Sequence, residues 1–181
     1  MILAVPTALG APPRTAAVVD FYSLSSVPFV DGLFPERFVA DAITRMLPQA
    51  SHEGVAVIPR QDVRRAEREI NWQDSDVLRF ARLSELGRAA QADRLVAGWI
   101  ERLDLDAGRV RIGFPHISTY PLSGFATLRI QVFDVVQGRI IAEATGSAYG
   151  WGVTPLFAAE QALRDAAART LPGVMARLLA P

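Results

Sequence analysis

The sequence contains no cysteine, although half of its 181 residues are hydrophobic. The absence of cysteine excludes disulfides, thiolate zinc sites and cysteine nucleophiles, and it removes the thiol that lipoprotein acylation needs. A chain of this length and apolar content can bury a core without such cross-links. We therefore expect residues 15–181 to form one domain that is held together by packing.

The chain also lacks net charge and long apolar runs. Its 19 basic and 19 acidic residues cancel, so no overall field attracts nucleic acid or an acidic membrane. No apolar run approaches the roughly 20 residues that span a bilayer. We expect no nucleic-acid partner and no transmembrane segment.

No pattern of catalytic, metal-binding or cofactor-binding residues is visible. The two histidines, His52 and His116, fall in separate predicted loops, and one His52–Glu53 pair is a poor metal site. The glycines of 108–124 and 146–152 lack phosphate-binding and dinucleotide spacing, and we interpret them as turn residues. The sequence thus predicts a protein that is not an enzyme, with no metal and no cofactor, and it does not identify a small-molecule ligand.

One helical side carries several arginines. Arg60, Arg64 and Arg68 share that side, while Glu67 and Glu69 dilute its charge. We interpret the segment as a solvated helix, and a phosphate-binding patch is the alternative.

Residues 1–14 resemble the end of an export signal. A short apolar run precedes Ala8-Leu9-Gly10, which has small residues at the two positions that a signal peptidase reads. This segment is either a signal-peptide remnant or an apolar tail. The first reading predicts a periplasmic or exported protein, and the second leaves a cytoplasmic location open.

Hydrophobic periodicity and turn residues predict the elements of the domain. Pro48 is expected to end the first helix, Asp76 to open the third, and Pro172 to kink or interrupt the last, which Thr154 caps with Pro155 at its first position. Segments 105–124 and 147–152 are expected to be loops, apart from a small hairpin near the start of the first. Strands are predicted at 15–21, 54–59, 95–100, 125–133 and 139–145, and helices at 35–47, 62–70, 76–90 and 154–174.

The order of these elements predicts an α/β (α+β) fold. Helices link the first three strands, which should therefore be parallel, and strands 125–133 and 139–145 should form an antiparallel hairpin with one solvated face. The result is a five-stranded mixed sheet of order 2-1-3-4-5 with helices on its faces.

Two phrases resemble the TolB amino-terminal domain and the CsgG-like curli-assembly family, which share an anticodon-binding-domain-like fold. They are the segment QADRLVAG (91–98), where a helix ends and a buried strand begins, and DVVQGRII (134–141), where a strand ends in Asp before a Gly turn. Gln91 and Gln137 stand where the family usually has Gly and often Thr. The resemblance implies a non-catalytic envelope module, without the propeller of TolB or the membrane-spanning hairpins of CsgG.

The predicted topology gathers aromatic residues at one end of the sheet. Ligands tend to bind at the carboxyl ends of parallel strands, and exposed aromatic side chains mark protein interfaces. We therefore predict that this end binds a protein partner or a second copy, although its rings could instead fold inward and seal the sheet. Its residues are Phe29, Phe34, Trp72, Phe114, His116, Tyr120, Tyr149 and Trp151.

Two alternative functions remain open. The first is a small-molecule-binding protein or enzyme with a pocket under loop 105–124. The second is nucleic-acid binding through the arginine side of the 62–70 helix.

Overall fold

The computed structural model describes residues 14–24, 30–50, 55–106, 110–113, 116–119 and 122–179. The predicted signal remnant lies outside these residues except for Arg14. The strands of the described structure are β1 (Arg14–Val18), β2 (Tyr22–Ser23), β3 (Val55–Val57), β4 (Arg94–Asp106), β5 (Val110–Gly113), β6 (His116–Thr119), β7 (Leu122–Asp134) and β8 (Arg139–Gly152). The helices are α1 (Pro35–Ala50), α2 (Arg60–Glu69), the 3₁₀ helix η1 (Asp74–Leu78), α3 (Phe80–Ala89) and α4 (Pro155–Leu179).

The main sheet has the predicted strand order. It runs β3-β1-β4-β7-β8, with β1 parallel to both β3 and β4, and with β4, β7 and β8 antiparallel in turn. The short strand β2 adds a sixth member by pairing with β4 at Tyr22 and Trp99. The predicted α/β mixed sheet is therefore confirmed, including its 2-1-3-4-5 order.

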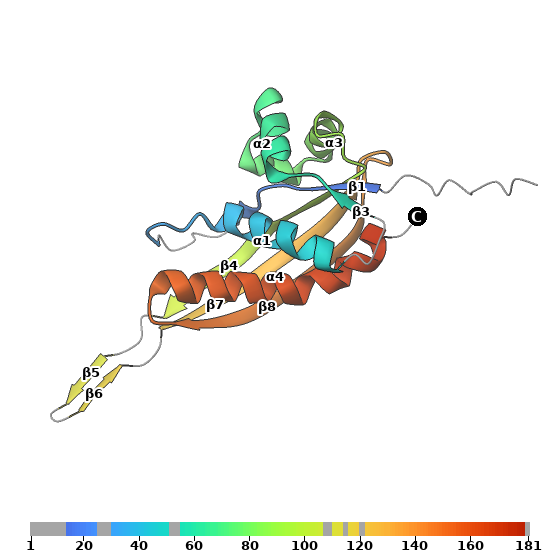
Figure 1. Cartoon of the computed structure of the whole chain (residues 1–181). Coiled ribbons are helices and arrows are strands. Elements are labelled where there is room, and N and C mark those ends of the chain that lie inside the picture. The colour runs from blue at the N-terminus through green and yellow to red at the C-terminus, as the bar shows by residue number, and fades with distance from the viewer. Residues whose placement is uncertain are drawn as a thin grey trace, which may run out of the picture.

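Helices cover the two faces of this sheet to different extents (Figure 1). On one face, α1 and α4 bury a core that includes Val96, Ile130 and Leu163. On the other, α2, η1 and α3 bury a smaller core around Leu83, Leu95 and Phe133. In Figure 1 the strands β4, β7 and β8 extend well past α2 and α3, so this second face is covered at one end only.

The prediction of a loop at 147–152 is wrong, because β8 continues as a strand to Gly152. The glycines that suggested a turn instead face α4. A β-carbon at Gly150 would collide with the backbone of Ala158 and Ala162, and one at Gly146 would collide with the side chain of Thr170. These glycines permit close approach of the helix to the sheet.

The segment 105–124 is also more regular than predicted. Strand β4 runs to Asp106, and the next two strands, β5 and β6, pair antiparallel with each other in a separate two-stranded sheet. The prediction of a hairpin that turns at 106–108 is wrong, because β5 pairs with β6 while the end of β4 pairs with β7. The observed hairpin includes part of the 115–124 stretch that was expected to be irregular.

Two prolines do not end their helices. The α1 helix continues through Pro48 to Ala50, and α4 continues through Pro172 to Leu179. In contrast, the predicted cap of α4 is confirmed, because the Thr154 hydroxyl accepts a hydrogen bond from the Phe157 N–H at 3.1 Å. No helix among the described residues has the length and apolar content to cross a membrane.

Candidate interaction surface

The uncovered half of the second sheet face forms what we call the open face. It consists of outward-pointing residues of β4, β7 and β8, and strand alternation places their neighbours in the core beneath α4. The predicted solvated face of the hairpin is part of it. Its members are Trp99, Glu101, Arg102, Phe125, Thr127, Arg129, Glu143, Ser147, Tyr149 and Trp151.

Aromatic side chains cluster at the distal end of the open face. The rings of Phe125 and Tyr149, which are paired across β7 and β8, have centroids 4.8 Å apart. The guanidinium of Arg102 lies 5.4 Å from the centre of the Phe125 ring. Tyr149 is 61% exposed, and Trp151, two residues further on the same side of β8, is 54% exposed. This end therefore presents rigid aromatic surface to solvent.

A polar ladder fixes the middle of the open face. Arg129 donates hydrogen bonds to Glu101 at 2.8 Å and to Glu143 at 3.1 Å, and its guanidinium lies 5.4 Å from the centre of the Trp99 ring. The hydroxyls of Thr127 and Ser147 are 2.9 Å apart across the strands. These contacts tie three strands together and leave the surface preorganised.

The open face borders the edge of the sheet. Within the described part of the chain, the 14-residue strand β8 pairs with β7 alone. A long unpaired edge exposes backbone donors and acceptors that another strand can pair with. The aromatic cluster and this edge are adjacent because both belong to β8.

The structure separates the residues that the sequence predicted to gather at one end. Phe34 is 66% exposed and precedes α1, whose Glu36 side chain bonds to Ser23 of β2, level with Ile100 of β4. Tyr149 instead lies level with Phe125 and Asp104. The four residues from Ile100 to Asp104 span about 13 Å at ~3.3 Å per residue, so the Phe34 side of the sheet and the Tyr149 side are well separated.

Among the other predicted members that the structure describes, Trp72 does not join the aromatic cluster. Trp72 was interpreted as exposed, but it is half-buried and packs against the core beneath α2 and α3. His116 belongs to β6, and its side chain lies outside the described part of the structure, as do Phe29, Phe114 and Tyr120. The structure therefore brings together Tyr149 and Trp151 from the predicted set.

Sequence reasoning missed Phe125 and Arg102 as members of this cluster. The alternation of the predicted strand 125–133 puts Thr127 and Arg129 on its solvated face, and it puts Phe125 on the same face. The sequence therefore did contain a signal that Phe125 belongs to the open face. No sequence signal placed Arg102 on the open face, because the register shift between Ile100 and Arg102 changes which side chains of β4 point to that face.

A modest hollow lies where the described ends of segment 105–124 meet the open face. It has a volume of about 280 Å³ and is lined by residues such as Asp106, Ser123 and Tyr149. This is slightly below the range of about 300–1,000 Å³ for small-molecule sites. Among the described residues, no group of three or more His, Asp or Glu side chains is arranged as a metal site.

Comparison with known proteins gives matches in structure alone. No family model matches the chain, and no curated protein sequence matches it significantly. Lipoprotein GNA1162 from Neisseria meningitidis aligns with a TM-score of 0.54 at 12% identity, over 78% of this chain and 86% of that chain. This chain shares the fold of that protein.

Two structures of LpoB support the same conclusion. The C-terminal domain from Salmonella enterica aligns with a TM-score of 0.50 at 11% identity, over 77% of this chain and 85% of that one. LpoB from E. coli aligns with a TM-score of 0.51 at 12% identity, over 78% of this chain and 59% of that one. At such identities the likeness concerns the fold, and membership of the TolB/CsgG-like family stays a prediction.

Proposed function

We propose that this chain is a non-catalytic module of the cell envelope that binds another protein, or a second copy of itself, through its open face. The observation that carries the proposal is the cluster of Phe125 with the exposed Tyr149 and Trp151, beside the edge of β8 that no described strand covers. Aromatic residues and arginine are enriched at the centres of protein interfaces. Their fixed positions on a sheet also reduce the entropy that binding costs.

The fold supports the envelope part of the proposal. GNA1162, with which this chain shares its fold, is a lipoprotein, and the sequence carries an apolar amino-terminal segment that resembles an export signal. The strand order agrees with the TolB/CsgG-like relationship, which we retain as part of the proposal. An extended segment that pairs with β8 and packs against Tyr149 and Trp151 would use both features of the surface.

The double variant Tyr149→Ser/Trp151→Ser is expected to weaken association by at least about tenfold, because interface anchors contribute about 2 kcal/mol or more. The purified chain is immobilised and exposed to solubilised envelope proteins of its source organism, and retained proteins are quantified by mass spectrometry. Sedimentation velocity of the chain alone measures self-association in parallel.

Phe157→Ser is the matched control for this experiment. Phe157 is 55% exposed, like Trp151, but it belongs to α4 on the opposite face. The control should retain every association that the double variant loses. Equal retention by the wild type and by the folded double variant would show that the open face is not the interface.

A further inference from the structure

Side chains of α4 bind two backbone groups of β8. The Gln161 Oε1 accepts a hydrogen bond from the Trp151 N–H at 3.1 Å, and Arg169 Nη1 donates one to the Ser147 carbonyl oxygen at 3.4 Å. Side chains that occupy such groups protect an edge strand from unwanted pairing. The helix that follows β8 in the chain therefore closes part of the edge of that strand.

The pattern of an antiparallel ladder shows that these groups belong to the edge. The backbone groups of alternate residues point to opposite sides of a strand, so Ser147, Tyr149 and Trp151 share one side. Because α4 binds the first and the last of them, that side faces away from β7. Side chains approach closely at such positions of a strand pair, as the hydroxyls of Thr127 and Ser147 do at 2.9 Å.

The spacing along α4 matches the spacing along β8. The helix rises about 12 Å from Gln161 to Arg169 at ~1.5 Å per residue, and the two bonded positions of β8 lie about 13 Å apart at ~3.3 Å per residue. Asp165 lies midway between Gln161 and Arg169 and on the same side of the helix. It comes level with Tyr149, so the flank of α4 beside the edge carries an amide, a carboxylate and a guanidinium in turn.

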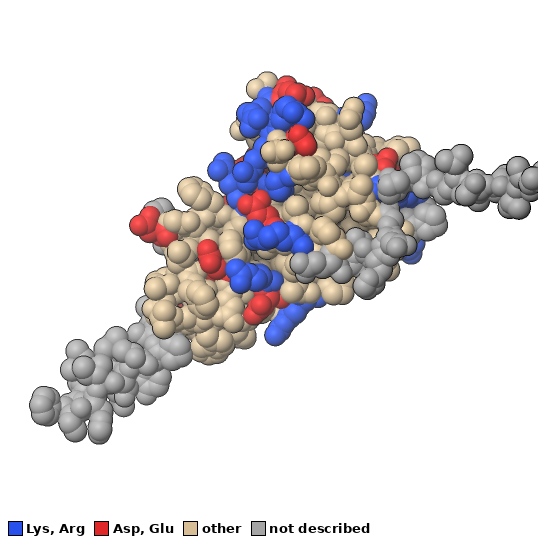
Figure 2. Space-filling model, viewed as in Figure 1, with Lys and Arg blue, Asp and Glu red and all other residues tan. Residues whose placement is uncertain are grey.

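The face of the molecule that carries α4 has charges of both signs. Figure 1 shows α4 in front of the sheet, and Figure 2, which has the same view, shows acidic and basic side chains intermingled. Asp165 and Arg169 place one charge of each sign beside the edge of β8. A segment that docks there is complementary when it brings a cation to Asp165 and an anion to Arg169.

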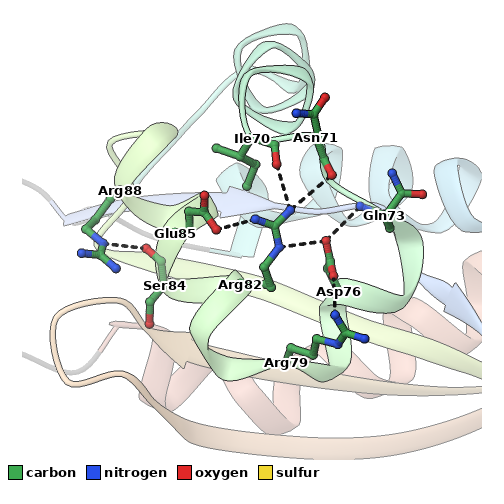
Figure 3. A network of polar contacts seen from close by, with 9 residues as sticks. All are labelled: Ile70, Asn71, Gln73, Asp76, Arg79, Arg82, Ser84, Glu85 and Arg88. Atoms are coloured by element: carbon green, nitrogen blue, oxygen red, sulfur yellow. Dashed lines mark hydrogen bonds and ion pairs between the residues drawn. The ribbon is translucent and has the colours of Figure 1, made fainter.

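The helices over the other half of this sheet face are fixed in place (Figure 3). Asp76 is 4% exposed; it accepts a hydrogen bond from the Gln73 N–H at 3.1 Å and one from Arg82 Nε at 3.0 Å. Arg82 also donates to the carbonyl oxygens of Ile70 and Asn71. This network ties the end of α2 to α3, which confines docking to the open face and the edge of β8.

We propose that α4 closes the edge of β8 until an extended segment of a partner protein takes over its two hydrogen bonds. A backbone carbonyl of the segment replaces Gln161 Oε1 at the Trp151 N–H, and a backbone N–H replaces Arg169 at the Ser147 carbonyl. Opening costs little, because each bond within the chain is exchanged for one to the segment. The inference rests on the proposed function, since this edge adjoins the aromatic cluster.

The register defines the chemistry of the segment. An antiparallel segment continues the alternation of β4, β7 and β8, and its residues that bond to Trp151, Tyr149 and Ser147 point to the open face. The two rings favour aliphatic side chains opposite them. The residues between point to α4, where a basic one lies near Asp165 and an acidic one near Arg169. From its amino terminus, the segment is therefore aliphatic, basic, aliphatic, acidic and hydroxylated.

The probe is the peptide acetyl-Val-Lys-Val-Asp-Thr-Ser-Thr-amide, and the full chain carries ¹⁵N in its three tryptophans. The backbone amide signal that is missing in Trp151→Phe identifies Trp151. The peptide should shift this signal in a saturable manner with a Kd below about 1 mM. A peptide with its lysine and aspartate exchanged should bind about fivefold more weakly, because it brings like charges together.

N-methylated peptides separate strand pairing from contact with the open face alone. Methyl groups on the second valine and the first threonine remove the N–H groups that would bond to β8, so binding should be lost. Methyl groups on the lysine and the aspartate remove N–H groups that point away from β8. This second peptide has the same side chains and should keep its affinity within about threefold.

Gln161→Ala tests whether α4 closes the edge. The variant releases the Trp151 N–H, so the peptide should bind about threefold to tenfold more tightly, which is the effect of one lost hydrogen bond within the chain. Glu160→Ala is the matched control, because it removes a neighbouring half-buried side chain on another side of α4. The control should bind the peptide like the wild type.

Arg169→Glu tests the charge assignment. The variant places an acidic residue at each end of the charged pair, so the preference between the two charge orders of the peptide should disappear. Arg164→Glu changes an exposed arginine on the opposite flank of α4, where its guanidinium lies over the Phe38 ring. This control should keep the preference of the wild type.

Four results would overturn the inference. They are the absence of a saturable shift in the wild-type chain, unchanged affinity in folded Gln161→Ala, equal binding of the peptide methylated at its pairing positions, and dimerisation of the chain alone that Gln161→Ala strengthens. The third would leave the open face as an interface without strand pairing, and the fourth would identify a second copy as the occupant. Failure of the proposed function is a separate result, namely equal retention of envelope proteins by the wild type and by Tyr149→Ser/Trp151→Ser.

Discussion

Gly150→Val is expected to lower the free energy of unfolding by about 3 kcal/mol or more. Gly150 is buried in β8, and a β-carbon there would collide with the backbone of Ala158 and Ala162 in α4. A backbone cannot yield as a flexible side chain can, so the helix must move away from the sheet. That movement would loosen the core that includes Ala159, Leu163 and Val174.

Urea denaturation measures this loss, and Thr145→Val is the matched control. Thr145 lies on the same strand but is exposed, so its replacement should change stability by less than about 0.5 kcal/mol. A Gly150→Val protein as stable as the control would show that α4 does not pack tightly against β8.

Asp76→Asn is expected to cost about 2 kcal/mol of stability at neutral pH, because hydrogen bonds to charged groups contribute about 1.5–3 kcal/mol. The substitution keeps the shape of the side chain but removes the charge that Arg82 and Arg79 face. The link between the end of α2 and the start of α3 should weaken with it. Asp62→Asn, which disrupts the single exposed pair with Arg65, should cost less than about 1 kcal/mol.

The contribution of Asp76 to the stability of the protein should depend on pH. Burial by itself raises the pKa of Asp76, but the hydrogen bonds from Gln73 and Arg82 outweigh it, so the pKa lies below its ordinary value of 3.8. A carboxyl whose pKa is lowered by folding stabilises the protein above its unfolded-state pKa. This stabilisation is lost as the pH falls through the lower, folded-state pKa.

Denaturation curves measured between pH 7 and pH 2 test this dependence. The difference in stability between the wild type and Asp76→Asn should be largest at neutral pH and should shrink below about pH 4. A difference that stays constant over this range would show that the charge of Asp76 does not stabilise the fold.

The sheet order was predictable because it depends on features that are local in sequence. The apolar run 95–100 marks a strand covered on both faces, and the alternation of 125–133 followed by Gly138 marks a hairpin. Connection rules then leave few possible arrangements. Each of these signals is contained within one segment.

The extent of β8 could not be predicted because it depends on a tertiary contact. Glycines at 146, 150 and 152 have the composition of a loop, and only the position of α4 explains them. The same reason applies to Pro48, where packing of α1 outweighs the local cost of proline. Without knowledge of the partner element, the local rule gives the wrong structure.

The candidate surface was predictable in part. Tyr149 and Trp151 were assigned to an interaction surface from the topology, and strand alternation does place both on the open face of the sheet. Trp72 was also assigned to it, although it is half-buried and packs against the core beneath α2 and α3. A polar cavity lined by Asp20, Arg37 and Glu67 was missed, because its walls come from segments that are far apart in the sequence.

The most direct test of the central claim is photo-crosslinking in cells that produce this chain. A benzoylphenylalanine residue replaces Trp151 on the open face or, as a control, Phe157 on α4. The account predicts that position 151 cross-links to one discrete protein, either a partner or a second copy, and that position 157 does not. No cross-link at position 151, or the same products at both positions, would contradict it.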